Sequence, residues 1–452
     1  MSARTSGLES AARRTLAFRP APVRLMVVCS LLLALLAGCG QSQSQSQGQG
    51  QGAGSTPATG GAGQQGGQKV VLTFWNGFTG PDRPAVEGLV KQFNDTHLNI
   101  EVQMDISPWD TLLQKLPGAL STGQGPDLMG VSFSYMPQYA QSGYLKDLTP
   151  YFQPGTDLDP ANFPQGLVQV LKYQDKFYGA PMNFATLMMY YNKDHFKAAG
   201  LDPDNPPRTW DEWIPAIKKL TKPNGQQYGL VLGEHQTIPN WPILLWGNGG
   251  DVIKDGKPAL SDPKTVEALK IWTDLVKNDK ISPTGLTGAE ADKLFETGKA
   301  SMEVTGPWMT NGFTAAGLNF DVAPVPAGPA GPVTLADSVL MMVNNASKHP
   351  DAAVEFIKFW NSKQSQIYWS QGSGFPPARL DLANDPELAK NKWVPRFASV
   401  ASTARFYLPG QPRFAQIDTE VFVPMIQQIT LGRKSVEDAT READQKLAEL
   451  LK

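Results

Sequence analysis

Hydrophobic positions at the start of the folded region switch between the period of a strand and the period of a helix. Residues 70–75 form a near-continuous apolar run, and residues 100–104 alternate between apolar and polar as a half-buried strand does. The apolar residues between these segments recur at helical spacing: Val86, Leu89, Val90 and Phe93. A second helical pattern, rich in leucine, covers 112–120, and a short strand at 127–131 follows it. The alternation predicts an α/β fold with an open parallel sheet covered by helices on both faces.

Helical patterns become more frequent beyond residue 180. They lie at 210–220, from Asp262 to about residue 278, at 350–360 and at 435–452. Extended segments at 177–180 and 187–192 separate the two regions, and we place a hinge there. The Pro/Gly-rich stretch 324–332 predicts a further loop or crossing. The pattern therefore predicts two lobes joined by more than one segment.

The N-terminus carries a targeting pattern. Residues 1–24 contain five arginines, and the apolar run 25–37 follows, which is too short for the roughly 20 residues that span a bilayer. The run closes on Leu36-Ala-Gly-Cys39, which resembles the bacterial lipoprotein box, in which the cysteine thiol receives a lipid. We therefore expect 1–38 to be a lipoprotein signal peptide and Cys39 to be the lipidated residue. Residues 39–69 are rich in Gln, Ser and Gly and predict a flexible linker.

Composition and charge exclude several classes of function. The chain of 452 residues has a net charge of −2 and no continuous basic face, so we expect no nucleic-acid partner. Cys29 leaves with the signal peptide and Cys39 is lipidated, so no thiol remains for a disulfide or for catalysis. The four histidines are far apart in sequence, and no metal-ligand spacing is present. We expect no metal and no cofactor.

One stretch of the second half carries a specific resemblance. Residues 181–213 read PMNFATLMMYYNKDHFKAAGLDPDNPPRTWDEW, and 295–309 read FETGKASMEVTGPWM. These segments resemble the extracellular solute-binding proteins of the maltose-binding and glycerol-3-phosphate-binding type, which serve ABC importers. The resemblance covers about residues 70–450. It departs from the family pattern at 335–338, where LADS replaces a Gly-Gly-Ser-like turn, which weakens the expectation of a phosphate ligand.

The resemblance implies a type II periplasmic-binding-protein fold, in which two lobes, each an open sheet flanked by helices, close over a ligand. We expect an N-terminal lobe formed by 70–182 plus about 313–345. The C-terminal lobe would hold 183–312 plus about 346–452. The implied partners are a carbohydrate or glycerol-phosphate ligand, the permease subunits of an ABC transporter and, through the lipid, the outer face of the cell membrane. We expect a monomer.

Sugars present flat apolar faces and hydroxyl rims, so their sites need aromatic rings and fixed polar groups. The chain has eleven tryptophans. The resemblance, with this chemistry, places the ligand site at Trp75, Phe78, Asp82, Asn183, Trp241 or Trp246, Trp308, Asp337, Phe375 and Arg405. We expect no catalytic residue.

An enzyme remains the alternative. Secreted glycosidases also line clefts with tryptophan, and they act through a pair of carboxylates whose sequence spacing is not fixed. The acidic residues of this chain could supply such a pair. The sequence contains no G-x-S-x-G serine-hydrolase motif with suitable flanks and no phosphate-binding loop, so nucleotide hydrolysis would belong to a partner.

Overall fold

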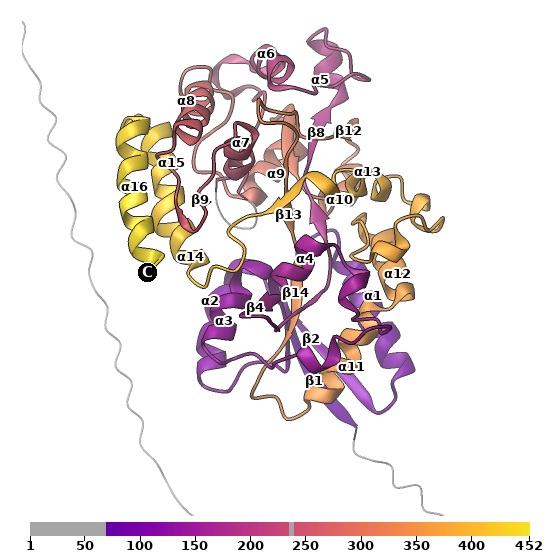
Figure 1. Cartoon of the computed structure of the whole chain (residues 1–452). Helices are drawn as coiled ribbons and strands as arrows, with labels where there is room; N and C mark the ends of the chain where they lie inside the picture. Colours follow the sequence, from indigo (N-terminus) through magenta and orange to yellow (C-terminus); the bar gives the residue numbers. More distant parts are fainter. Residues whose placement is uncertain (1–68, 235–238) are drawn as a thin grey trace, which may run out of the picture. The chain divides into compact units, whose positions relative to one another are not determined.

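The computed structural model describes residues 69–234 and 239–452. The expected signal peptide, Cys39 and all of the linker except Lys69 therefore lie outside the described residues. The described chain forms two α/β lobes, drawn in Figure 1 with the indigo and purple N-terminal segments in one and the pink segments in the other. Within the described ranges, no helix combines the length and the apolar character needed to cross a membrane.

The first lobe is built on a five-stranded sheet of order β2-β1-β3-β14-β6. The strands are β1 (Val70–Asn76), β2 (Ile100–Ile106), β3 (Leu128–Ser132), β6 (Ala180–Pro181) and β14 (Val339–Val343). Strand β1 runs parallel to β2 and β3, whereas β14 is antiparallel to β3 and β6. The sheet is thus mixed rather than wholly parallel, because β14 enters it from the second lobe.

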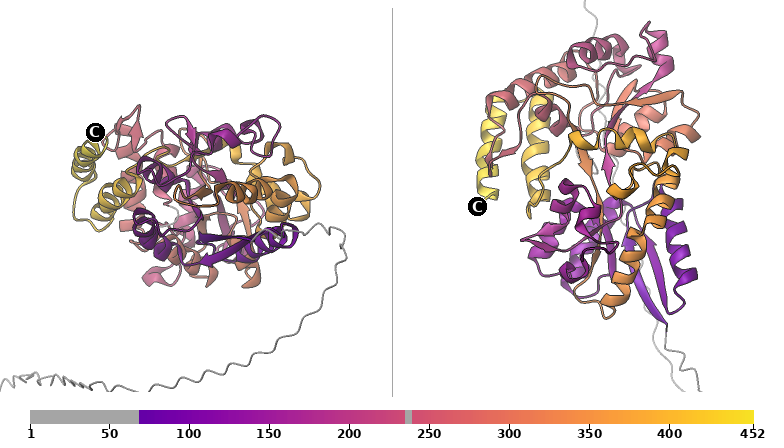
Figure 2. Two further views of the ribbon diagram at one scale, coloured as in Figure 1. Left: turned by 90° about the horizontal axis from the view of Figure 1, so that it is seen from below. Right: turned by 45° about the vertical axis from the view of Figure 1, so that its right-hand side comes forward.

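Helices cover this sheet with the apolar stripes that the sequence predicts. They are α1 (Arg83–Thr96), α2 (Trp109–Ser121), α3 (Met136–Gln141), α4 (Gln165–Val170), α11 (Pro350–Asn361) and α12 (Lys363–Ser373), with a hairpin of β4 (Lys172–Tyr173) and β5 (Lys176–Phe177) beside them. The stripe of α1 ends at Phe93, whose ring lies 4.9 Å from that of Phe356 on α11. Figure 2 shows the orange helices α11 and α12 beside the indigo α1.

The second lobe has a smaller sheet and more helices. Its central strand β8 (Met188–Asn192) pairs antiparallel with β11 (Met302–Thr305) and β12 (Phe320–Ala323). The helices are α5 (Lys193–Ala198), α6 (Trp210–Leu220), α7 (Trp241–Gly247), α8 (Pro263–Lys277), α9 (Gly288–Glu296), α10 (Met309–Ala315), α13 (Val394–Ala398), α14 (Phe414–Gln416), α15 (Val423–Thr430) and α16 (Val436–Leu450), with a hairpin of β9 (Ile253–Lys254) and β10 (Lys257–Pro258). A π-helical turn, 417–422, joins α14 to α15. The yellow helices α15 and α16 lie side by side on the outside of this lobe (Figure 1).

A third small sheet lies where the chain passes between the lobes. It consists of β7 (Ala185–Thr186), β13 (Thr334–Asp337) and β15 (Ala404–Phe406), with β13 in the middle. The chain passes between the lobes at β7 and again between β13 and β14. The side chain of Asn183 links these two passages, since its Oδ1 accepts a hydrogen bond of 2.8 Å from the backbone N–H of Val339. The hinge expected near residues 180–192 therefore coincides with an observed crossing, and β13 to β14 forms the second.

The division of the chain between the lobes differs from the expected boundaries. Residues 350–378 were expected in the second lobe, yet Ala353, Trp360 and Trp369 are buried in the core of the first. Residues 313–323 were expected in the first lobe, yet Phe313 and Val322 lie in a core cluster of the second. A helical stripe shows that a helix is buried on one side, but it does not show which sheet the helix covers.

Candidate ligand-binding site

A cavity of about 330 Å³ lies between the lobes, within the size range of small-molecule sites. The first lobe contributes Phe78, Thr79, Gly80, Pro81, Asp82, Trp109, Asp110, Leu113, Ser132, Phe133, Ser134, Tyr135 and Phe375. The second lobe contributes Pro239, Ala289, Asp292, Trp308, Met309, Tyr407, Phe414 and Asp418. The passages between the lobes contribute Asn183, Leu335, Ala336, Asp337 and Val339. The cavity is therefore walled by aromatic rings and carries carboxyl groups.

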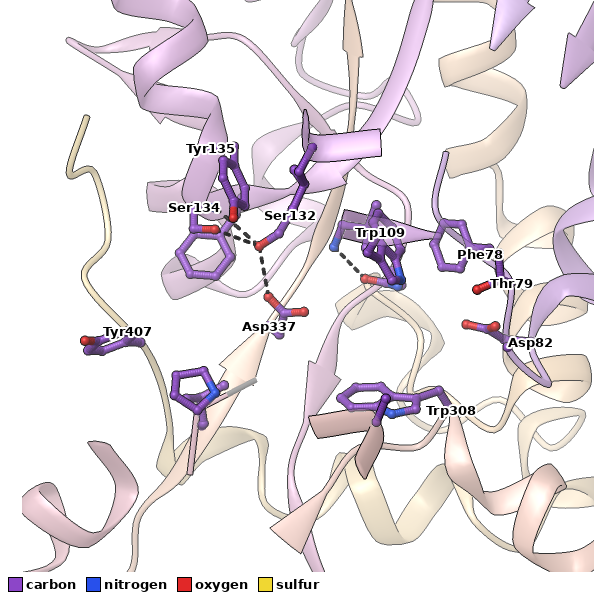
Figure 3. A pocket seen from close by; sticks show the side chains of 18 of the residues that line it. Phe78, Thr79, Asp82, Trp109, Ser132, Ser134, Tyr135, Trp308, Asp337 and Tyr407 are labelled. Carbon is purple, nitrogen blue, oxygen red and sulfur yellow. Dashed lines mark hydrogen bonds between the residues drawn. The ribbon is translucent and has the colours of Figure 1, made fainter. Parts of the chain in front are cut away.

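The first-lobe corner of the cavity is formed by Phe78 and Trp109. Phe78 follows β1, and its ring meets that of Trp109 edge-on at 5.5 Å between centroids. A Cβ on Gly77 would lie 2.1 Å from the Trp109 ring, so the indole rests directly on the backbone at the end of β1. The absence of a side chain at Gly77 thus allows Trp109 to lie against the sheet edge, with Asp82 close by (Figure 3).

The opposite wall is Trp308, at the turn that precedes α10. A Cβ on Gly306 would lie 1.9 Å from its ring, so this indole also lies directly on glycine backbone. The buried hydroxyl of Tyr190 donates a 2.7 Å hydrogen bond to the carbonyl of Gly306 and fixes the turn. Trp308 lies 6.0 Å from the ring of Phe375, which comes from the first lobe. Trp308 is partly exposed, and Figure 3 shows its ring lying across the cavity.

Asp337 lies between these walls, at the end of β13. The hydroxyl of Ser132 lies 3.5 Å from Asp337 Oδ1 and 3.0 Å from the hydroxyl of Ser134 (Figure 3). Asn183 lines the cavity too, but its side-chain oxygen already accepts from Val339. Asp337 therefore presents a carboxyl group at the hinge, supported by one weak hydrogen bond from the first lobe.

The far end of the cavity is formed by the C-terminal segments of the second lobe. The ring of Tyr407 lies 5.8 Å from that of Phe414, and Phe414 meets Tyr135 of the first lobe at 6.0 Å. Asp418 lies on the π-helical turn, is 8% exposed, and its Oδ1 has no hydrogen-bond partner within the described residues.

Burial changes the ionisation of the acids in the cavity. It raises the pKa of Asp82 to about 6, that of Asp337 to about 6 and that of Asp418 to about 7, because a charged carboxylate loses its hydration there. Hydrogen bonds from Ser338 and Ser132 to Asp337 oppose the effect of burial without cancelling it. These groups titrate close to neutrality.

A pair of neighbouring carboxyl groups lies at the edge of the cavity. Asp292 on α9 lines it, and Glu303 on β11 is buried behind it, beside a much smaller void. Burial raises the pKa of both groups, and the proximity of Asp292 raises that of Glu303 further. Thr305 donates a 3.1 Å hydrogen bond to Asp292. Burial and the repulsion between the two carboxylates therefore oppose the ionisation of both groups together.

Six of the residues predicted from the sequence line this single cavity: Phe78, Asp82, Asn183, Trp308, Asp337 and Phe375. They come from the ends of β1 and β13, the first passage, and the turns before α10 and after α12. Their contact with a ligand stays a prediction, but the fold brings them together as expected.

The other four predicted residues do not line the cavity. Trp75 packs on the first core, with the Lys115 ammonium 4.0 Å from its ring centre. Trp241 is 1% exposed, in a helix buried along its whole length. Trp246 donates its indole N–H to Asp251. Arg405 pairs with Asp251 at 2.7 Å and lies over Trp246. These side chains are used in packing and pairing within the protein.

Sequence reasoning missed several lining residues, among them Trp109, Asp292, Tyr407 and Asp418. Trp109 carried a usable signal, because it begins a helix directly after the second strand and so lies at the carboxyl edge of the sheet. Asp418 carried none, since it lies in a helical segment more than 300 residues from Asp82 in sequence. Among the described residues, no three histidine, cysteine or acidic side chains gather as a metal site would require.

The sequence matches those of known proteins. The model of the family described as bacterial extracellular solute-binding protein matches residues 79–367. The chain is 29% identical over 382 residues to a binding protein of Brucella abortus (strain 2308), covering 82% of this chain and 90% of that protein. It is 24% identical over 367 residues to the maltotriose-binding protein of Pyrococcus abyssi, covering 78% of this chain and 75% of that one.

The solved structures agree with the sequence matches. The crystal structure of an ABC transporter solute-binding protein from Thermotoga lettingae, bound with α-D-tagatose, superposes with a TM-score of 0.77 at 26% identity. The match covers 85% of this chain and all of that chain. The two-lobe type II fold expected from the sequence is therefore confirmed. Because the family model covers more than half of the chain and the fold agrees with it, this protein belongs to the bacterial extracellular solute-binding protein family.

Proposed function

We propose that the protein is the sugar-binding component of an ABC importer, which captures a sugar or short oligosaccharide between its lobes and delivers it to the permease. The observation that carries this proposal is the cavity between Trp109 on one lobe and Trp308 on the other. Two flat indoles from opposite lobes suit the two apolar faces of a sugar ring, and carboxyl groups suit the hydroxyl rim. The sugar ligands named for similar proteins support this choice.

The mechanism is ligand-driven closure. Trp109, Phe78 and Asp82 belong to the first lobe, whereas Trp308, Tyr407 and Asp418 belong to the second, so a solute contacts both sets only when the lobes are together. Its affinity therefore favours the closed form, and the permease recognises that form. The passages at β7 and β13 would bend during this change, with Asn183 keeping them in register.

The function is tested by a binding screen on the full chain purified in detergent. Calorimetry and thermal melting would be recorded against mono- and oligosaccharides, polyols and glycerol-3-phosphate, and X-ray scattering would follow the radius of gyration. A true ligand at 100 times its Kd stabilises the protein by about 2.7 kcal/mol and contracts it. Binding without contraction would contradict closure, and no binding by any sugar would contradict the proposed function.

The same screen separates binding from catalysis. A glycosidase would consume the sugar, whereas a binding protein returns it unchanged, so the ligand is analysed by chromatography after incubation. Carboxyl groups do line the cavity, which keeps this control necessary. Appearance of a hydrolysis product would replace the transport proposal by the enzymatic one.

We also propose that the chain is anchored through a lipid on Cys39 to the outer face of the cell membrane and acts there as a monomer. The support is the sequence Leu36-Ala-Gly-Cys39 after an apolar run. Acyl chains contribute roughly 0.8 kcal/mol for each buried methylene, so a diacyl anchor holds the protein stably. In cells labelled with a fatty acid, we expect the label in the native chain and none in Cys39→Ser. Equal labelling of both would contradict the anchor.

A further inference from the structure

The cavity has a one-sided electrostatic character. Five carboxyl groups line it: Asp82, Asp110, Asp292, Asp337 and Asp418. Within 69–234 and 239–452, no lysine, arginine or histidine side chain lines it. Arg405, the cation that the sequence assigned to the site, is paired with Asp251 outside it. Among the described lining residues, an anionic solute would therefore meet carboxyl groups and no cationic side chain.

Asp82 is the most exceptional of these acids. It precedes α1 in the N-cap position but forms no side-chain cap bond, and within the described part of the chain no hydrogen bond or ion pair joins its carboxyl group to another residue. It is only 7% exposed. Figure 3 shows the carboxyl group directed toward the space bounded by Phe78, Trp109 and Trp308. A buried, unpartnered carboxyl group among aromatic rings is the arrangement that binds organic cations, through charge pairing and cation–π attraction.

Buried carboxyl groups also lie at the centre and at the other end of the cavity. Asp418 has an unpartnered Oδ1 in the buried corner beside Tyr407, and at the centre Asp337 has the 3.5 Å contact from Ser132 and a backbone hydrogen bond from Ser338. Burial favours the neutral form of each acid in the empty cavity. A neutral sugar supplies hydroxyl donors, but it brings no charge that could pair with an ionised carboxylate in the enclosed cavity. A bound cation supplies donors and compensating charge together.

Resting on the sugar-binding function proposed above, we propose that the solute is a sugar or sugar-like polyol that carries a protonated amine, and that Asp82 pairs with this amine inside the corner of Phe78, Trp109 and Trp308. The ring of the same solute then lies along Trp308, and its remaining hydroxyls reach Asp337 and the Asp418 end. Anionic sugars and glycerol phosphates are excluded by the same charge.

The test uses matched pairs of ligands that differ in one group. Glucosamine, galactosamine and mannosamine each replace one hydroxyl of the parent sugar with an ammonium group, and the β-1,4-linked glucosamine dimer does so on each ring of cellobiose. Calorimetry on the full chain in detergent, in phosphate buffer at pH 7.5 because Tris is itself an amine, gives both affinities. We expect the amine member of at least one pair to bind about ten- to hundredfold more tightly. We also expect this preference to fall as salt is raised.

Single substitutions test which carboxyl group pairs with the amine. Asp82→Asn keeps the size of the side chain and should reduce the amine preference to about onefold, whatever it does to the affinity for the parent sugar. Asp175→Asn removes the same charge from the exposed turn between β4 and β5, outside the cavity, and should leave the preference unchanged. A preference that survives in Asp82→Asn and disappears in Asp418→Asn would overturn the assignment to Asp82.

The outcomes also separate this inference from the function on which it rests. If neutral sugars bind as tightly as or more tightly than their amine partners, the amine is rejected and the sugar-binding function stands. If neither member of any pair binds, and the wider screen is also empty, both proposals are rejected. A tighter amine with the expected salt and Asp82→Asn effects supports both.

Discussion

Tryptophan occupies two contrasting environments in this protein. In the second-lobe core, Trp213, Trp241 and Trp272 are at most 1% exposed, and their indole N–H groups have no partner among the described residues. In the cavity, Trp109 and Trp308 are only partly buried, and each lies flat on a glycine backbone. The first group is enclosed by side chains on all sides, whereas the second keeps one face open. The local backbone, and not the residue type, decides which tryptophan is available to a ligand.

The largest effect, on the free energy of unfolding, should come from removing one of the buried core tryptophans. Trp272 meets Trp210 and Trp213 at 5.1 and 5.2 Å between ring centroids, and it is completely buried. Trp272→Ala should lower the free energy of unfolding by about 3–5 kcal/mol, because it leaves a large cavity. Urea unfolding followed by circular dichroism measures this, and the folded fraction should bind ligand with unchanged affinity. A loss of only a few tenths of a kcal/mol would show that the core closes over the void.

Removal of a cavity indole should lower the affinity for the ligand and leave the stability of the fold nearly unchanged. Trp308→Ala is expected to weaken ligand binding by roughly 1.5–3 kcal/mol, the scale of a lost buried aromatic contact, and to leave the unfolding midpoint nearly unchanged. Calorimetry with the ligand found in the screen measures the change. Trp75→Ala is the matched control, since Trp75 lies outside the cavity and should not affect affinity. Equal affinity in Trp308→Ala and the native chain would make Trp308 structural.

A subtler change tests the role of the backbone beneath the indole. Gly306→Ala would place a methyl group 1.9 Å from the present position of the Trp308 ring, so the ring must move. We expect affinity to fall by about 1–2 kcal/mol, less than in Trp308→Ala, because the indole is displaced but not lost. Gly118→Ala in α2 has open space around the new methyl group and serves as the control, with affinity unchanged and stability equal or slightly higher. Wild-type affinity in Gly306→Ala would show that the ring position is not set by this glycine.

A pH dependence of stability, which needs no substitution, also distinguishes the cavity from the surface. The raised pKa values of Asp82, Asp337 and Asp418 mean that the native state holds more protons than the unfolded state. The unliganded protein should therefore lose stability, by at most a few kcal/mol, as pH rises from about 4 to about 7. Surface acids such as Asp381, whose pKa Arg379 lowers to about 2, act in the opposite direction at lower pH.

Urea titrations at several pH values measure this slope. Asp418→Asn should flatten the slope between pH 4 and 7, because it removes the group whose pKa is raised most among the three. An identical slope in the native chain and in Asp418→Asn would mean that another group is responsible.

Much of the fold followed from periodicity. The helices expected at 210–220 and from 263 to about 278 match α6 and α8 closely, since both have a clear apolar stripe and a proline or threonine at their start. The assignment of α11 and α12 to a lobe did not follow. That choice depends on the contact of Phe356 with Phe74 and Phe93, residues more than 250 positions away, and no local pattern records it.

The candidate site was predictable where it lies next to a sheet edge or a marked turn. Phe78 and Asp82 follow the first strand, and Trp308 follows a Gly-Pro turn, so simple rules place them near one another. Trp241 does not line the cavity because α7 is buried on every face, which a short apolar segment does not reveal. Arg405 does not line the cavity for a different reason: Asp251 pairs with it, and their separation of 154 residues left no sequence signal.

The position of β14 has a consequence for folding during synthesis. This strand lies inside the first sheet, between β3 and β6, but it is made only after the second-lobe strands β8, β11 and β12. Until β14 has been made, the nascent first lobe has open strand edges on β3 and β6, where other chains could pair. Neither half of the polypeptide is thus a folding unit by itself. A chain cut near residue 330 should aggregate rather than yield a working first lobe, and rapid chaperone capture should matter more for this protein than for one whose domains follow each other in sequence.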